Sequence, residues 1–372
     1  MSRKFHITSL DIFDTLMAKG RKIGIDGLMN MAKNKYILIS KGDDKEKLAE
    51  YVSQLPYDYD DIVALYEIIE QDTRREKLST IQIKKKMEYD HIQEAVDSLS
   101  TQLANCGEHL SIKSNPNQPV LFLEYEYKDV DFGKATMLQE TTLRDRIEFS
   151  LKKTDLTDVR FAANQKCKDL IDRIIKEIEQ ISKNSIDVDE IELSHISDGG
   201  KRNRFFFSLI SAIPGLELDD VSGVKISKSN DSLTVEDEIK ELAGDDVEND
   251  AMATKELTGF IKEVAIKGRA LLSQKEYQDF VSKGFYISNI VWKSLDKNIE
   301  PNLLVEFEAG FSNHQECKGF QYAVKGAYSY KKNESIYSTT RKPLTEPDKL
   351  KYKSMLEESA RRSKKEASHE EI

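Results

Sequence analysis

The chain has 372 residues, of which 39% are hydrophobic and 33% charged, and its formal net charge is −10. This length allows two or three domains, and no apolar run approaches the roughly 18 residues that cross a bilayer. No long apolar segment follows the basic residues of the N-terminus, and the three cysteines are too few for a disulfide framework. We therefore expect a cytoplasmic protein with no membrane partner and no disulfide scaffold.

Most of the acidity lies in one segment. Residues 231–250 contain nine acids and one lysine, a local charge of −8. Like charges repel and oppose compaction, so we expect residues 231–255 to form an acidic linker or loop. The remainder of the chain is close to neutral and carries basic clusters, so the net charge does not exclude a nucleic-acid partner.

The first 150 residues are expected to form an α+β region. Residues 4–13 and 35–40 are predicted to be strands. The spacing of apolar residues predicts helices at 43–55, at 62–69 and from 81 to 103. Residues 119–128 then change to a period of two, which predicts another strand.

The sequence LDIFDTL, residues 10–16, resembles the first motif of haloacid-dehalogenase-type hydrolases. In that family an aspartate at the end of a strand is the nucleophile, and the resemblance assigns this role to Asp11. It covers about seven residues, and the lysine and paired aspartates of the family's later motifs are not found at matching spacing. The alternative is an ordinary strand-to-loop junction capped by Asp14 or Thr15.

The best-formed unit of the sequence lies in the central region, residues 151–230. A helix with a strong apolar stripe is predicted from 158 to 183. Ile191, Leu193 and Ile196 then suit a short strand, Gly199-Gly200 interrupt it, and helical spacing follows up to Ile213. A further strand is expected beyond Pro214-Gly215. The order is therefore strand, glycine turn, helix, strand.

This glycine turn is the predicted nucleic-acid or phosphate site. A helix N-terminus exposes unpaired N–H groups and attracts anions, and glycines let a phosphate approach the backbone. The residues assigned to the site are His195, Gly199, Gly200, Lys201, Arg202 and Arg204. Two alternatives remain open, namely a solvated turn and a helix capped by Asp198, whose charge would occupy the phosphate position.

The C-terminal region, residues 256–341, is predicted to contain a helix at 257–281 and an antiparallel meander. The three strands of the meander are expected at 285–293, 303–311 and 320–331. Residues 342–372 carry many charges and few apolar anchors. They are expected to form a frayed helix or a disordered tail.

Glu124, Glu126 and Lys128 are the catalytic candidates. They share one face of the strand at 119–128, where two carboxylates and a lysine can hold Mg²⁺ and position a hydroxide. The pair Glu126 and Lys128 is similar to the latter half of the PD-(D/E)xK nuclease motif, although the preceding aspartate is not identifiable. The wet face of an antiparallel sheet gives the same alternation.

Two further pairs have the spacing of zinc ligands, Cys106 with His109 and His314 with Cys317. A shared metal site is one interpretation, and singly buried cysteines are the other. A cofactor is expected only in the nuclease case, as Mg²⁺.

The sequence thus predicts an α+β fold with long helices, two antiparallel β regions and a central strand–turn–helix unit. The first functional hypothesis is an intracellular nucleic-acid-interacting protein without a catalytic motif, of the kind found among bacterial accessory or phage-defence proteins. The second is a metal-dependent nuclease or phosphohydrolase. The third is a scaffold that binds only protein through its apolar helical stripes. Self-association into a homo-oligomer is also expected.

Overall fold

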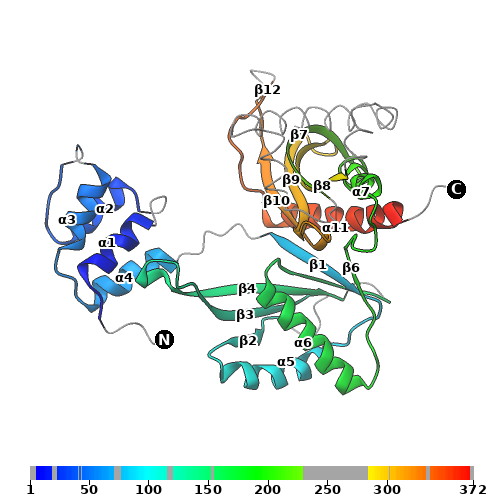
Figure 1. The fold of residues 1–372 in the computed structure, drawn as a ribbon, viewed down its shortest axis with the longest axis horizontal. Coiled ribbons are helices and arrows are strands. Elements are labelled where there is room, and N and C mark those ends of the chain that lie inside the picture. Colours follow the sequence, from blue (N-terminus) through cyan, green and yellow to red (C-terminus); the bar gives the residue numbers. More distant parts are fainter. Residues whose placement is uncertain are drawn as a thin grey trace. The chain divides into compact units, whose positions relative to one another are not determined.

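The computed structural model describes residues 6–18, 23–40, 42, 44–70, 77–114, 120–151, 155–228, 284–300, 302–331 and 336–368. It has a mixed α+β fold in which helices accompany a large antiparallel sheet, as predicted (Figure 1). The expected acidic segment at 231–255 and the helix expected at 257–281 lie outside the described residues. Within the described residues, no helix combines the length and the apolar character needed to span a membrane.

The chain divides into two compact units. The first contains Met1–Arg75, Gln93–Ser114 and Phe122–Arg146, and the second contains Glu76–Ile92, Asn115–Leu121 and Ile147–Ile372. Helix α5 (Tyr89–Ala104) and strands β3 (Val120–Val130) and β4 (Glu140–Ser150) each have residues in both units.

In the first unit, four helices and a short 3-10 turn surround one apolar core. They are α1 (Ser9–Ala18), α2 (Ile25–Asn34), α3 (Lys45–Ser53), α4 (Tyr59–Glu70) and η1 (Thr136–Leu138). Fully buried Leu16, Leu28 and Val52 lie at the centre of this core. Strand β2 (His109–Ile112) pairs with β3, and β3 neighbours β4.

The predicted strand at 4–13 is wrong, because Ser9 begins a helix. Thr8 and Asp11 form a capping arrangement in which the Thr8 hydroxyl accepts from the Asp11 amide at 3.2 Å and the Asp11 carboxylate accepts from the Thr8 amide at 2.9 Å. This reciprocal capping satisfies two amides at the start of the helix. Asp11 therefore caps α1, and the strand end that the hydrolase resemblance required is absent here.

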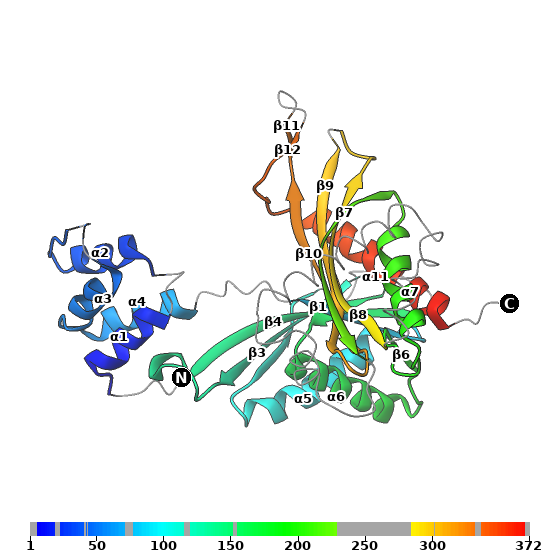
Figure 2. The ribbon, with the colours of Figure 1, turned by 45° about the horizontal axis from the view of Figure 1, so that its top comes forward.

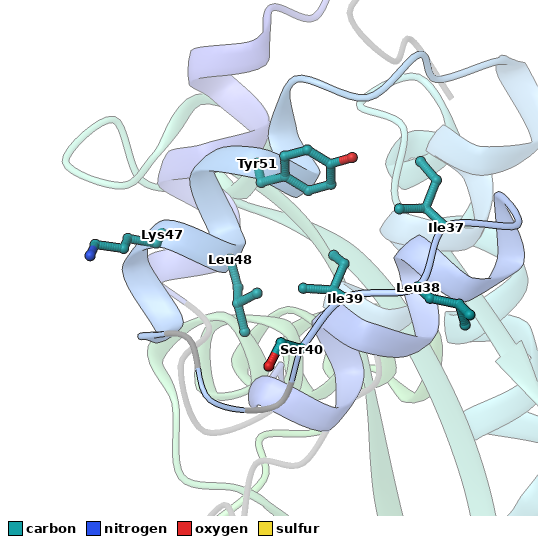
Figure 3. Close-up of a pocket in the computed structure, with 7 residues that line it drawn as sticks. All are labelled: Ile37, Leu38, Ile39, Ser40, Lys47, Leu48 and Tyr51. Carbon is teal, nitrogen blue, oxygen red and sulfur yellow. The ribbon is translucent and has the colours of Figure 1, made fainter.

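The predicted strand at 35–40 is also wrong as an assignment. Residues 36–40 lie beside α3 in an irregular conformation and pair with no described strand (Figure 3). Their strand-like alternation nevertheless persists, because Ile37 and Ile39 pack against the core while Leu38 is 90% exposed.

In the second unit, an antiparallel sheet runs in the order β5, β1, β10, β9, β8, β7, and the last residues of β4 pair with β5. The bounds are β1 (Leu78–Ile83), β5 (Thr157–Ala162), β7 (Leu216–Lys228), β8 (Phe285–Asp296), β9 (Leu303–Asn313) and β10 (Lys318–Tyr328). A short strand, β6 (Val188–Glu190), also pairs with β1. The predicted C-terminal meander is thus confirmed as β8, β9 and β10 and is extended by β7.

The described elements in this part of the chain fall into two similar sets. A helix, four strands and a helix are α5, β2 to β5 and α6 (Gln165–Ser182) in the first set, with η1 between β3 and β4. In the second set they are α7 (Gly199–Ser211), β7 to β10 and α11 (Glu346–Ser368), with two further short strands before α11. The last strand of each set, β5 or β10, pairs antiparallel with β1. These two sets of described elements therefore meet at β1.

Two helix predictions in this unit need correction at their N-terminal ends. The segment around Ile81 is strand β1, and Thr157–Ala162 is strand β5, so α6 begins only at Gln165. Asn164 marks that start, because its side chain accepts from the amide of Cys167 at 2.8 Å. The apolar pattern alone did not separate a short strand from the helix that follows it.

The C-terminal segment is a helix, but it is neither frayed nor detached. In α11, Tyr352, Leu356 and Ala360 are fully buried, and they join the core that also contains residues of α7 and of β7 to β10. Figures 1 and 2 show α7 and α11 side by side against this meander. The small side chains of α11 gave a weak apolar pattern in the sequence, although they allow close packing.

Candidate nucleic-acid interface

The predicted glycine turn is the first turn of α7. The strand expected just before it is not formed, although Ile191 and Leu193 are buried as anticipated. Asp198 is the N-cap, and its carboxylate accepts from the amides of Gly200 at 2.6 Å and Lys201 at 3.3 Å. A carboxylate thus occupies the position that a bound phosphate requires, as the capping alternative proposed.

The packing around the first glycine gives it a structural role. Gly199 is buried, and a side chain there would place its Cβ 3.1 Å from the carbonyl oxygen of Phe285. That separation is shorter than ordinary van der Waals contact. The glycine therefore permits close approach of α7 to β8, whatever else binds nearby.

Arg202 points into the protein. It is 5% exposed, and its guanidinium donates to the carbonyl oxygens of Ile196 at 2.7 Å and Gln315 at 3.1 Å. It also lies 4.4 Å from the ring centroid of Tyr286, a cation–π contact. Burial raises the pKa of Tyr286 to about 12. Arg202 thus holds α7 against the loop between β9 and β10.

The other basic residues of the turn are more accessible. Lys201 and Arg204 are half-buried on α7 and have interaction partners within the protein. His195 is exposed, and its Nε2 lies 3.1 Å from the hydroxyl of Ser368 at the end of α11. The predicted phosphate site is therefore a turn whose cap is filled and whose central arginine is internal.

The three catalytic candidates occupy the outer face of β3, as the alternation predicted, and each has an oppositely charged partner. Lys113 lies 3.2 Å from Glu124, Arg144 lies 2.6 Å from Glu126, and Glu140 lies 3.2 Å from Lys128. A metal ion bound by Glu126 would have to displace the Arg144 guanidinium. Across the described residues, no cluster of three or more His, Cys, Asp or Glu side chains suits a metal ion.

The two proposed zinc pairs fall in different units. Cys106 is exposed in the first unit, and His109 pairs with Glu126 across β2 and β3. In the second unit Cys317 is fully buried, and burial raises its pKa to about 11. Burial, with the charges of Lys225 and Lys77, lowers the pKa of His314. A high thiol pKa opposes the thiolate form that zinc binds.

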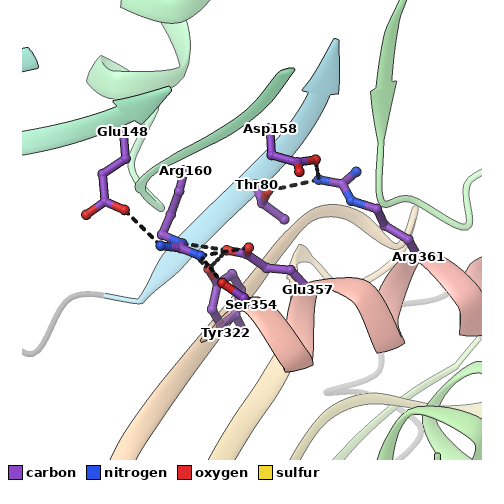
Figure 4. Close-up of polar contacts among 8 residues, drawn as sticks. All are labelled: Thr80, Glu148, Asp158, Arg160, Tyr322, Ser354, Glu357 and Arg361. Carbon is purple, nitrogen blue, oxygen red and sulfur yellow. Dashed lines mark hydrogen bonds and ion pairs between the residues drawn. The ribbon is translucent and has the colours of Figure 1, made fainter. Parts of the chain in front are cut away.

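Basic residues near the C-terminus are used to dock α11. The Arg361 guanidinium donates to the hydroxyl of Thr80 at 3.0 Å and lies 3.6 Å from the Asp158 carboxylate (Figure 4). Lys364 donates to the carboxylate of Asp189 and to the carbonyl of Glu190, both at 2.7 Å. These basic residues could have indicated a site for an external anion. In the structure they donate instead to acceptors within the protein.

A group that the sequence analysis did not single out lies on the outer face of β8 to β10, opposite the core. Glu306, which is only 7% exposed, and the half-buried Glu308 alternate along β9 with the fully buried Val305 and Phe307. Lys77 and Lys325 lie 2.6 and 3.0 Å from Glu308. Arg341 pairs with Glu306, and Lys293 is opposite Glu306 in the strand register. Among these described residues, four cations therefore accompany two carboxylates.

The face continues into a hairpin of β11 (Tyr330–Lys331) and β12 (Ile336–Tyr337), which projects beyond the end of β10 (Figure 2). The rings of Tyr330 and Tyr337 meet edge to face at 5.3 Å. Lys293 lies 4.8 Å from the ring centroid of Tyr328. We call the stretch 325–342, of which the structure describes 325–331 and 336–342, the basic hairpin.

The composition of the basic hairpin could have revealed it. Its 18 residues include five lysines or arginines, one glutamate and three tyrosines, a net charge of +4 in a chain of net charge −10. Scanning the sequence for local net charge and aromatic content identifies this stretch. A search for motifs of fixed spacing does not.

Comparisons with known proteins give no family for this chain. Its sequence matches no protein-family model and none of the curated proteins.

Proposed function

We propose that the protein binds nucleic acid through the basic hairpin. The observation that carries this proposal is the combination of four described cations, Lys325, Lys331, Arg341 and Lys342, with three tyrosines on the strands β10 to β12 and the residues that flank them. Lysine and arginine side chains neutralise phosphates, and tyrosine rings stack on unpaired bases. The predicted class of partner is retained, and the contact surface moves from the turn at α7 to this hairpin.

Internal acids neutralise only part of the charge. Glu306 pairs with Arg341 and Glu308 pairs with Lys325, whereas Lys342 is exposed. Lys331 is also exposed and has an interaction partner within the protein. Tyr328, Tyr330 and Tyr337 are half-buried, so part of each residue is accessible. Single-stranded nucleic acid fits this arrangement better than duplex, because its bases are free to stack on the rings.

The test is the binding of labelled single- and double-stranded DNA and RNA over a salt series. We expect binding that weakens steeply with salt and is stronger for single strands. Lys331→Ala/Lys342→Ala should lower the affinity and reduce the slope of log K against log salt by about 1.4 for single strands. Lys33→Ala/Lys176→Ala removes two exposed lysines elsewhere and should leave both quantities unchanged.

A second variant separates stacking from charge. Tyr330→Ala keeps the net charge and should weaken single-strand binding by about 1–3 kcal/mol while changing duplex binding less. Absence of salt-sensitive binding to all four nucleic acids at low salt would overturn the proposal. Equal losses in the two double-lysine variants would remove the hairpin as the contact surface.

A further inference from the structure

Another group of cations lies on the outer face of β3 and β4, in the first unit, around a pocket of about 350 Å³. The exposed and half-buried residues that line this pocket are Lys113, Phe122, Glu124, Arg144 and Arg146. Asp145 also borders it, but this carboxylate is 6% exposed and accepts from the Tyr127 hydroxyl at 2.8 Å. The volume lies in the range of small-molecule sites, about 300–1,000 Å³.

Arg146 covers an aromatic ring at this pocket. Its guanidinium carbon lies 3.5 Å from the centroid of the Phe122 ring, a cation–π contact. Hydrogen bonds fix the backbone of Phe122, because its amide donates to the Ser114 hydroxyl at 2.7 Å and its carbonyl oxygen accepts from the Lys113 amide at 2.8 Å. Unpaired bases stack on aromatic rings and on arginine guanidinium planes. The exposed Arg146 therefore presents a group on which a base can stack.

The charges at the pocket favour an anion, because Lys113, Arg144 and Arg146 are cations and Glu124 is the one carboxylate among its exposed and half-buried lining residues. All three cations already have partners within the protein, Glu124 for Lys113 and Glu126 for Arg144 among them. The Lys113 and Arg144 side chains are nevertheless 56% and 67% exposed. Exposed ion pairs are weak because water solvates both charges, so a phosphate can replace the carboxylates.

We propose that this pocket binds one nucleotide of a single-stranded nucleic acid. The base stacks on Arg146, and the flanking phosphates contact Lys113 and Arg144. An unpaired base is required, because a base inside a duplex is already stacked between its neighbours. The inference rests on the proposed function for the class of partner. It adds a contact surface in the first unit to the basic hairpin of the second unit.

Photocross-linking of the full chain tests both surfaces at once. Single-stranded RNA that carries thiouridine, or DNA that carries thiothymidine, is irradiated with the protein, and mass spectrometry identifies the cross-linked peptides. We expect cross-links in the peptide that contains Phe122 as well as in the basic hairpin. Arg146→Ala should abolish those at Phe122, keep those in the hairpin and lower the affinity for single strands about tenfold. Because Arg146 is exposed, its replacement removes little from the fold.

Lys128→Ala is the matched control, because it removes one cation from the same face of β3 but away from the pocket, and it should keep the Phe122 cross-links. Cross-links in the hairpin with none at Phe122 would overturn this inference and leave the proposed function in place. Cross-links at Phe122 with none in the hairpin would support the pocket and remove the hairpin as a contact surface. Phe122 cross-links that survive Arg146→Ala, or no cross-links at all, would overturn the inference.

Discussion

Arginine–glutamate ion pairs occur both under α11 and on the outer face of β3. The pair under α11 is buried, whereas the pair on β3 is exposed to water. Under α11, Arg160 donates to the Glu357 carboxylate through two nitrogens, at 2.6 and 2.8 Å, and both residues are less than 10% exposed (Figure 4). On the outer face of β3, the Glu126 side chain is 28% exposed, and that of its partner Arg144 from β4 is 67% exposed. Water already solvates the second pair, whereas the first has lost its water and depends on its partners.

The buried group is a connected network. Tyr322 is fully buried and donates to Glu357, and Arg160 also lies 2.8 Å from Glu148. Burial and the Glu357 charge raise the pKa of Tyr322 well above its ordinary value. Burial lowers the pKa of Arg160, but the Glu357 carboxylate more than offsets this, so the arginine remains charged. Ion pairs between the same residue types therefore contribute very different amounts to the free energy of unfolding.

The largest effect is expected from Glu357→Ala. It leaves Arg160 buried without its main acceptor, which costs about 3–5 kcal/mol of unfolding free energy. Glu358→Ala, at the next and exposed position of α11, should cost less than about 0.5 kcal/mol. Urea unfolding measures both. Equal losses of unfolding free energy in the two variants would contradict a stabilising role for the buried network.

Asp296 extends the comparison to pH. It is fully buried, and it accepts from Lys351 at 2.8 Å and from Tyr352 at 2.9 Å. Burial raises its pKa, but these hydrogen bonds outweigh burial and lower it overall. Its contribution to stability is therefore present above the unfolded pKa near 3.9 and is lost as the pH falls through the lower folded value.

Asp296→Asn should accordingly cost about 2–3 kcal/mol at pH 7. The difference from wild type should narrow as the pH falls below about 4. Denaturant unfolding at pH 7 and at about pH 3 gives both values. A difference that stays constant over this range would show that the charge of Asp296 does not stabilise the fold.

Arg202→Ala tests whether the basic turn of α7 belongs with the buried group. It removes donors to two carbonyl oxygens and a cation–π contact, and we expect a loss of about 2 kcal/mol. Lys201→Ala, one residue earlier, should cost less than about 1 kcal/mol. Thermal unfolding of each single variant distinguishes them. If Arg202→Ala unfolds at the wild-type temperature, its internal contacts contribute little.

The smallest effect is expected on β3. Glu126→Ala breaks an exposed ion pair and should change the unfolding free energy by less than about 1 kcal/mol. A double-mutant cycle with Arg144→Ala measures the coupling directly, and added salt should reduce it. A coupling energy above about 2 kcal/mol would show that the Glu126–Arg144 pair stabilises the fold as strongly as the buried network does.

The candidate site residues were chosen from the sequence by residue type and spacing. What each one binds depends on the direction of its side chain in the fold. The alternation of Glu124, Glu126 and Lys128 correctly placed them on one outer face, because the period of a strand is local. The partners Arg144 and Glu140 come from β4 and Lys113 comes from the loop after β2, and no spacing within β3 indicates them. The internal direction of Arg202 likewise depends on the carbonyls of Ile196 and Gln315.

The sequence alone determined the elements with a long and regular pattern, among them α6, α7 and the strands β8 to β10, because helical and strand periods are properties of a short stretch of chain. It also determined where charge and tyrosine accumulate in residues 325–342. Tertiary structure decided which charges are internal, since burial and partner distance depend on residues far apart in the chain. The docking of α11 shows why: its charged pattern indicated a free tail, and Asp158, Arg160 and Asp296 from distant strands fix it in place.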